Sequence, residues 1–492
     1  MVTGDLNALK FPDIYGNTVP DFSRVGYREG HVKIPMVPIK KVLGPKDIHD
    51  GVHHDDRKRI QDAIDEVASL PLQCIGNDGA RIRGAVLLKA GTYHVSGALI
   101  INASGVVLRG EGQETIIIAN GTIQRDFILV NGMHSSDMGR QKTQLHKART
   151  REMMPRNGYK DTKGYSVGDR IVIERPGTEE WIHYLGMDDL PCRPDNHNPS
   201  VQWTPKSFTF RFERKVVAID QKTSTFIIDI PMVMCLDPNY PPSRIYELIH
   251  KFPTISDVGV ENLCLVGKAN PGGPEDMSED HGWYAIVVDN TIHGWVADVT
   301  IKHFVSGIYA AAWSRYITIQ DCSVKDPISK PKEGGRRYMF NLSGQMGLVK
   351  RCLAEYARHD FTTLGRVCGP NVFVDSIGDY GNNDSGPHER FAMGILYDNI
   401  TCAFHVIYNC TARTHNNCFQ DPPGTKNWII GFKGGVTSKP MFKGTRSDVE
   451  SPFPVRSLYW AQLVARMDGD IQRVNNTVGT EGRMKYPPRC YV

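Results

Sequence analysis

Titratable side chains gather in one stretch of the chain, between residues 325 and 390. Two aspartates in this stretch are 24 positions apart, and each has a histidine nearby. Side chains of these types can neutralise a carboxylate, move protons and stabilise developing charge. A surface set of salt bridges is the alternative interpretation. The candidate catalytic residues are His359, Asp360, Asp384, His388 and Arg390.

Two mechanisms fit this group. β-Elimination from a uronic acid needs a cation to neutralise the carboxylate, a base and an acid; arginine, histidine and tyrosine could fill these roles. Hydrolysis of a glycosidic bond needs two carboxyls, which Asp360 and Asp384 would supply. A separation of about 5 Å would favour retention and about 6.5–9.5 Å inversion. Stacked carboxylates also suit Ca²⁺, so a calcium-assisted elimination is a third option, although no metal ligands are assigned.

Candidate substrate-binding residues surround the same group. Arg336 and Arg337 are equally well explained as loop anchors. Trp181 begins a loop rich in Trp, Pro and Asp, whose rings would either stack on sugars or fill a seam within the fold. The candidates are Arg336, Arg337, Tyr338, Arg358, Arg366 and Trp181.

A repeat predicts the elements that position these residues. From Val258 onward, short β-branched and aromatic runs recur at spacings near 23 to 25, each followed by a polar residue and a turn. A coil of about two dozen residues that stacks on itself connects parallel strands without helices. Coils stack about 4.8 Å apart, so Asp360 and Asp384 would become neighbours. One spacing fails, because only 11 positions separate Asp398 from Asn409.

The predicted fold class is therefore all-β: a right-handed, single-stranded parallel β-helix with an N-terminal capping helix and a small antiparallel β insertion. Apolar positions at helical spacing in residues 57–69 predict the cap, with Asp55 or Asp56 before its first turn. Alternation at period two predicts the insertion. Cysteines that recur after the strand runs read as buried small hydrophobes; they are Cys264, Cys322, Cys352 and Cys410.

The predicted divisions follow this pattern. They are an N-terminal extension (1–50), the capping helix and first coils (51–132), the β insertion (133–255), the main coils with the candidate groove (256–445), and a C-terminal helix and tail (446–492).

Several stretches resemble a known superfamily. Asp55-Asp56, Gly84-Ala-Val-Leu-Leu and Ser104-Gly-Val-Val-Leu-Arg-Gly-Glu-Gly resemble the N-terminal motif of pectate-lyase-like β-helix proteins. Arg358-His-Asp-Phe and Asp384-Ser-Gly-Pro-His-Glu-Arg resemble a narrower, largely uncharacterised carbohydrate-active branch, which has a longer segment near residue 400. The superfamily includes polysaccharide lyases, glycoside hydrolases, epimerases and non-catalytic tailspikes, so the fold does not choose among them.

Composition narrows the partners and the compartment. The chain has 492 residues, a net charge of +4 and no Lys/Arg run, so no nucleic-acid partner is indicated. No apolar run is long enough to predict a membrane span. The start of the chain shows no signal-peptide pattern. Seven Asn-x-Ser/Thr sequons nevertheless indicate a secreted, extracellular glycoprotein.

These observations lead to an expected function. We expect a polysaccharide lyase that acts on a uronic-acid-containing polysaccharide, because arginines gather around the candidate groove. A glycoside hydrolase using Asp360 and Asp384 is the first alternative, and a non-catalytic glycan-binding β-helix is the second. The expected partner is an acidic polysaccharide, Ca²⁺ is the one cofactor considered, and monomer or homotrimer stays open.

Overall fold

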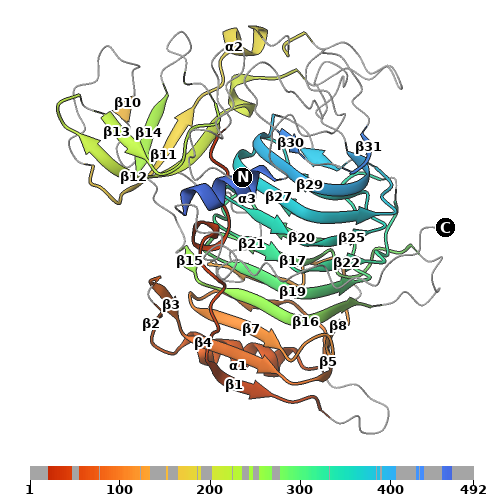
Figure 1. Ribbon diagram of the computed structural model, residues 1–492. Coiled ribbons are helices and arrows are strands. Elements are labelled where there is room, and N and C mark those ends of the chain that lie inside the picture. Colours follow the sequence, from red (N-terminus) through yellow and green to blue (C-terminus); the bar gives the residue numbers. More distant parts are fainter. Residues whose placement is uncertain are drawn as a thin grey trace.

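The computed structural model shows a chain built mainly from stacked parallel strands (Figure 1). It describes residues 20–46, 55–76, 78–121, 123–132, 151–152, 165–184, 187–189, 202–223, 225–234, 236, 243–247, 254–268, 277–331, 333–383, 385–387, 391–405, 428–430, 433–436 and 457–467.

Two long parallel ladders form the body of the molecule, and they confirm the predicted all-β parallel β-helix. The larger, 15-stranded sheet contains the principal series β1 (Ile39–Leu43), β4 (Gly84–Leu88), β7 (Val106–Gly110), β16 (Gly259–Gly267), β19 (Trp295–Lys302), β21 (Thr318–Gln320), β24 (Leu348–Lys350), β27 (Cys368–Asp379) and β29 (Met393–His405). Its remaining strands are β5 (Gly91–Val95), β8 (Thr115–Ala119), β22 (Ser323–Lys325), β25 (Leu353–Glu355), β30 (Trp428–Ile430) and β31 (Lys433–Val436).

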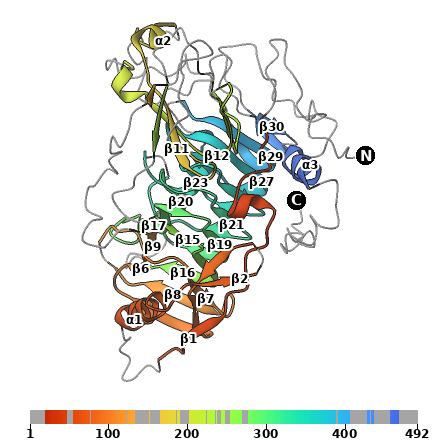
Figure 2. The same ribbon diagram turned by 90° about the vertical axis from the view of Figure 1, so that its left-hand side faces the viewer.

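The second ladder is a seven-stranded sheet, visible in Figure 2 as a series that leads up to the insertion strands β11 and β12. Its strands are β6 (Leu99–Ile101), β9 (Ile128–Asn131), β17 (Tyr284–Asp289), β20 (Ser306–Ala310), β23 (Tyr338–Leu342), β26 (His359–Thr363) and β28 (Gly386–Pro387). Two short pairs accompany the ladders, β2 (Gln73–Ile75) with β3 (Ala80–Ile82) and β15 (Ile255–Ser256) with β18 (Thr291–Ile292).

The strand register follows the predicted repeat. Lys350 pairs with Val374, and Val374 pairs with Asp398, so each of these steps spans one coil of 24 residues. The spacing that failed has a structural explanation, because β29 continues to His405 and its Leu396 pairs with Trp428. The next paired strand thus begins well beyond Asn409, which lies outside the described residues.

Apolar side chains on matching positions fill the interior. A continuous column runs through the principal strands, and each member is 0% exposed: Val86, Leu108, Val260, Val296, Ile319, Val349, Phe373 and Tyr397. Burying one such side chain stabilises the fold by about 1.5–3 kcal/mol. Cys264, Cys322 and Cys352 are buried free thiols, as predicted, whereas Cys410 lies outside the described residues.

The capping helix forms as predicted. Helix α1 (Arg57–Ala68) buries four apolar residues in the core at the first coils: Ile60, Ala63, Ile64 and Val67. At its start, Asp55 Oδ1 accepts a hydrogen bond from the Arg57 N–H at 3.0 Å, and Asp56 Oδ2 accepts one from the His94 N–H at 3.0 Å. These bonds hold the helix against the first coil.

The insertion is a five-stranded antiparallel sheet, in agreement with the predicted alternation. Its order is β10 (Arg151–Glu152), β14 (Arg244–Glu247), β11 (Arg170–Arg175), β12 (Phe210–Asp220) and β13 (Thr225–Ile228). Helix α2 (Glu179–Tyr184) and the 3₁₀ turn η4 (Pro205–Ser207) accompany it. Trp181 and Trp203 of the insertion share one apolar cluster with Phe391 and Met393 of the β-helix, which attaches the insertion to the coils.

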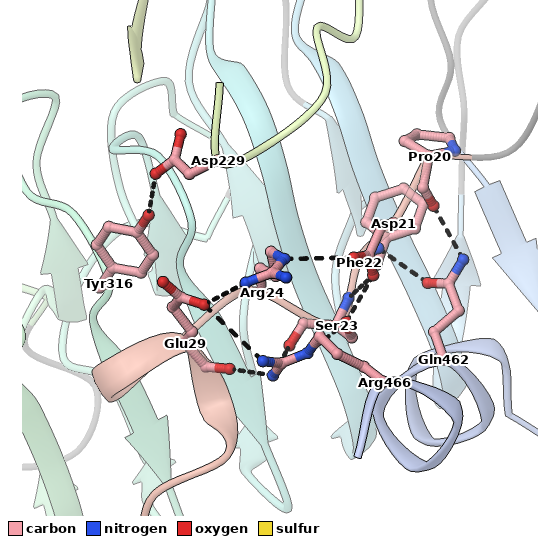
Figure 3. A network of polar contacts seen from close by, with 10 residues as sticks. All are labelled: Pro20, Asp21, Phe22, Ser23, Arg24, Glu29, Asp229, Tyr316, Gln462 and Arg466. Carbon is pink, nitrogen blue, oxygen red and sulfur yellow. Dashed lines mark hydrogen bonds and ion pairs between the residues drawn. The ribbon is translucent and has the colours of Figure 1, made fainter. Parts of the chain in front are cut away.

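The two ends of the described chain meet on the larger sheet. Helix α3 (Leu458–Arg466) contacts the segment that leads into the turn η2 (Tyr27–Gly30), as Figure 3 shows. Gln462 accepts a hydrogen bond from the Phe22 N–H at 2.8 Å, and Arg466 donates one to the Glu29 carbonyl at 2.7 Å. No described helix is long and apolar enough to cross a membrane.

Candidate functional site

His359 and Asp360 are adjacent on β26 and do not share a face. Neighbouring side chains on a strand point to opposite sides. The His359 ring stacks on Tyr338 with centroids 4.8 Å apart. The Asp360 carboxyl instead accepts a hydrogen bond from the Ser385 hydroxyl at 3.1 Å and occupies the space left by Gly378.

The placement of Asp360 differs from the predicted groove position. Gly378 pairs with Ala354, a residue of the hydrophobic core, so the carboxyl beside it lies in the interior of the coil. Asp360 is 1% exposed and His359 is 0% exposed. Neither side chain is therefore accessible to a sugar in this conformation. Asp384, His388 and Arg390 lie outside the described residues.

The contacts of Arg337 and Arg336 fit loop anchors rather than substrate clamps. Arg337 is 6% exposed and donates to the Ser329 and Tyr356 carbonyls, so it anchors loops. Arg336 pairs with Glu279 at 2.6 Å, which also fits the loop-anchor interpretation.

The other predicted substrate-binding residues are placed as follows. Arg358 is half-buried. The Tyr338 ring is buried and stacks on the His359 ring. Arg366 is exposed and donates to the Ser207 carbonyl at 2.6 Å. Trp181 is 5% exposed and packs edge-on against Phe391, so it fills the seam rather than offering a sugar platform.

A larger opening lies between the insertion and the second ladder. It is a cleft of about 430 Å³ at the carboxyl ends of three successive parallel strands, β20, β23 and β26. Because these ends align in a β-helix, their following residues meet along one wall. Its lining residues are Thr209, Arg211, Glu213, Tyr309, Ala312, Trp313, Ser343, Gln345, Leu364, Gly365, Arg366 and Cys368.

A pair of tyrosines continues from this cleft along the ladder. The rings of Tyr284 and Tyr309 stack with centroids 5.2 Å apart and an angle of 26° between the ring planes. Tyr309 lines the cleft, and both side chains are partly exposed. Flat aromatic faces of this kind suit the apolar faces of sugar rings.

Two carboxyls flank the tyrosine pair. Asp126 Oδ1 accepts a hydrogen bond from the Tyr284 N–H at 3.2 Å. Asp289 Oδ1 accepts from the Asn290 N–H at 2.9 Å and from the Trp313 N–H at 3.3 Å. Backbone groups of successive coils thus orient both carboxyls.

The surroundings shift the protonation of these groups. Burial raises the pKa of the Asp126 and Asp289 carboxyls above the ordinary aspartate range, more than their hydrogen bonds lower it. Burial also raises the pKa of the Tyr309 hydroxyl, with further contributions from the charges of Asp289 and Asp126. Both carboxyls therefore lie close enough to Tyr309 to influence it. Carboxyls with raised pKa beside a cleft are candidates for proton transfer.

The sequence contained only a partial signal for this group. Asp289 ends a β-branched run that begins at Tyr284, so a search for polar residues at strand ends would have found it. Asp126 reaches Tyr284 across 158 positions, because the insertion lies between them in the chain. A search for residues one coil apart does not detect such a contact.

Among the residues that the structure describes, no group of three or more His, Cys, Asp or Glu side chains is arranged to hold a metal ion. The predicted calcium option involved Asp384, which is not described.

Comparisons with known proteins find similar solved structures and no similar sequences. No family model matches the sequence, and no curated protein matches it. The tailspike protein of E. coli bacteriophage HK620, solved in complex with a pentasaccharide, has a TM-score of 0.39 and 10% identity, covering 88% of this chain and 50% of the tailspike. An iota-carrageenase complexed to iota-carrageenan fragments has a TM-score of 0.30 and 10% identity, covering 77% and 53%. ORF18 of Geobacillus virus E2 has a TM-score of 0.27 and 11% identity, covering 80% and 61%.

This chain thus spans about half the length of the tailspike that it matches. None of the comparisons shows membership of the pectate-lyase superfamily, which stays an expectation from sequence motifs. By its own strand pairing, the chain is an all-β parallel β-helix protein.

Proposed function

We propose that this chain is a carbohydrate-active enzyme that binds an extended glycan over Tyr284 and Tyr309 and hydrolyses it with Asp126 and Asp289. One observation carries the proposal: two carboxyls with raised pKa flank a stacked, partly exposed tyrosine pair that leads into the cleft. Glycoside hydrolysis uses two carboxyls in this way, one as an acid and the other as a base or nucleophile.

The hydrogen bonds suggest a division of roles between the two carboxyls. Asp289 accepts from two backbone N–H groups, whereas Asp126 accepts from one. Hydrogen bonds to a carboxylate favour its charged form. Asp289 is therefore assigned as the ionised base or nucleophile, and Asp126 as the acid that protonates the leaving oxygen.

β-Elimination is the second candidate, because two arginines line the cleft. The Arg211 guanidinium pairs with Glu174 at 2.9 Å, and its side chain is 44% exposed. Arg366 is exposed on the same wall. Together they would attract the carboxylates or sulfates of an acidic glycan. An acidic polysaccharide accordingly remains the proposed substrate class for either mechanism.

The test uses the full chain with a panel of neutral, uronate-containing and sulfated polysaccharides. Hydrolysis releases reducing ends without the ultraviolet absorbance of an unsaturated uronate, and elimination produces both. Asp126→Asn and Asp289→Asn should each lower the rate about 10²- to 10⁴-fold. Asp321→Asn is the control, since Asp321 pairs with Arg351 outside the cleft. Binding without cleavage by the wild-type chain would refute the enzymatic proposal and support a glycan-binding protein.

Secretion and glycosylation are part of the same proposal, with one correction. Asn341 is 0% exposed, so its sequon cannot carry a glycan in the folded chain. Glycosidase treatment of material secreted from a eukaryotic host, followed by mass spectrometry, would identify the sequons that are used. Sedimentation analysis of the same material would decide between monomer and homotrimer.

A further inference from the structure

A second, much smaller cavity lies where the insertion rests on the β-helix. Its volume is about 20 Å³. The insertion and the segment that follows β13 contribute one side, and the β-helix contributes the other. The lining residues are Arg170, Glu213, Arg214, Lys215, Asp229, Arg315, Tyr316 and Met346.

Arg315 is the central residue of this cavity. Its side chain is 2% exposed, and it pairs with Glu213. Its Nε and Nη2 atoms are buried without a hydrogen-bond partner among the described residues. Buried guanidinium donors are nearly always satisfied by protein, water or an ion, so these two atoms indicate a missing acceptor.

Two further arginines add positive charge. Arg214 donates to carbonyls, including those of Ile230 at 3.0 Å and Glu213 at 2.8 Å, and its guanidinium forms no ion pair within the described residues. The Arg170 guanidinium likewise forms no ion pair within that part of the chain. Burial lowers the pKa of the Arg170 and Arg214 guanidiniums, and the nearby negative charge of Asp229 offsets this effect only in part.

The carboxylates in the cavity do not balance these arginines. Glu213 is used by Arg315. Asp229 accepts hydrogen bonds from the Tyr316 hydroxyl at 3.1 Å and from the Lys215 N–H at 2.9 Å, and Figure 3 shows the first of these. The buried guanidiniums of Arg214 and Arg315 and the half-buried one of Arg170 thus face two carboxylates, and the exposed Lys215 adds a further positive charge at the edge.

We propose that this cavity binds one monatomic anion, chloride, between Arg315 of the β-helix and Arg170 of the insertion. The volume supports a monatomic ion, because about 20 Å³ accommodates roughly one water-sized sphere and not a tetrahedral oxyanion. The excess of positive charge selects an anion over water. The ion would supply the acceptor that the Arg315 donors lack.

The bound anion would stabilise the junction beside the larger cleft. Glu213 lines both cavities, so the wall between them contains the ion-paired Glu213–Arg315 unit. The anion would hold β12 against the β-helix and thereby maintain the width of the cleft. This inference does not depend on the catalytic roles proposed for Asp126 and Asp289.

Thermal unfolding of the full chain tests the proposal. The melting temperature is measured in sodium chloride and in sodium gluconate at equal pH and ionic strength, since gluconate is too large for the cavity. Above the dissociation constant, each tenfold rise in chloride should raise the melting temperature by roughly 1.4 °C, and bromide should act similarly. Arg315→Met should abolish this dependence. Arg351→Met is the matched control and should retain it, because Arg351 pairs with Asp321 away from the cavity.

A second measurement covers the case in which Arg315→Met does not fold. Crystals of the wild-type chain grown in bromide should show an anomalous peak within hydrogen-bonding distance of the Arg315 guanidinium. Equal melting temperatures in chloride and gluconate would overturn the proposal. A cavity that holds only water in the bromide crystal would also overturn it.

Discussion

Asp398 provides a quantitative test of how helix α3 is attached. This residue lies on β29 and is 0% exposed. Its Oδ2 atom accepts hydrogen bonds from the Ser457 hydroxyl at 2.6 Å and the Tyr459 N–H at 2.8 Å, at the start of α3. Burial nevertheless raises the pKa of the carboxyl to about 7, because it outweighs these two bonds.

The sign of the pH dependence follows from this pKa. The folded chain holds the proton of Asp398 more tightly than the unfolded chain, whose aspartates have a pKa near 3.9. The stabilisation from protonation is fully present below about pH 4 and is lost as the pH rises through about 7. The difference between the two pKa values corresponds to roughly 4 kcal/mol of unfolding free energy.

The perturbation is Asp398→Asn, which stays neutral at every pH and keeps an oxygen to accept both hydrogen bonds. Urea unfolding of the wild type and the variant, from about pH 4 to about pH 8, isolates this residue because other titrations cancel in the difference. The stability of the variant relative to the wild type should rise by roughly 4 kcal/mol across this range. A constant difference between the two chains would refute the reasoning.

Three further predictions concern other parts of the molecule. Gly378→Ala should lower the melting temperature, because the new Cβ would collide with the buried carboxyl of the neighbouring coil; an unchanged melting temperature would place that carboxyl elsewhere. Trp181→Ala should lower the unfolding free energy by about 3–5 kcal/mol, as a core truncation does, whereas Tyr184→Ala should change it little because Tyr184 is 69% exposed. Equal effects of the two substitutions in urea titrations would contradict the packing of Trp181 between the insertion and the β-helix. Arg366→Ala should weaken binding to an acidic glycan on an affinity column with little loss of stability, and Arg337→Ala should do the reverse; the opposite pattern would restore the predicted role of Arg337.

Local patterns predicted much of the fold. Four apolar residues at helical spacing identified α1, and the same four are its buried residues. The recurring strand runs identified the ladders because each coil repeats the same inward positions, as the Val349–Phe373–Tyr397 column illustrates. The failed spacing near Asn409 arose because β29 is longer than the other strands and pairs next with Trp428.

The site was less predictable because sequence spacing does not give side-chain direction. Ser385 contacts Asp360 inside the coil, whereas the predicted pairing of Asp360 with Asp384 stays a prediction because Asp384 lies outside the described residues. Arg337 was indistinguishable from a substrate clamp until its partners proved to be backbone carbonyls. The contact between Asp126 and Tyr284 crosses the whole insertion, and no local pattern predicts it.

The most direct test of the proposed hydrolysis is the mass of the products released from one defined acidic oligosaccharide. In hydrolysis, the masses of the two products add up to the mass of the substrate plus one water. Asp126→Asn and Asp289→Asn should release far less of both products in the same time. Products whose masses add up to the substrate alone would show β-elimination and contradict the account. Undiminished cleavage by both variants would contradict the assignment of these two carboxyls.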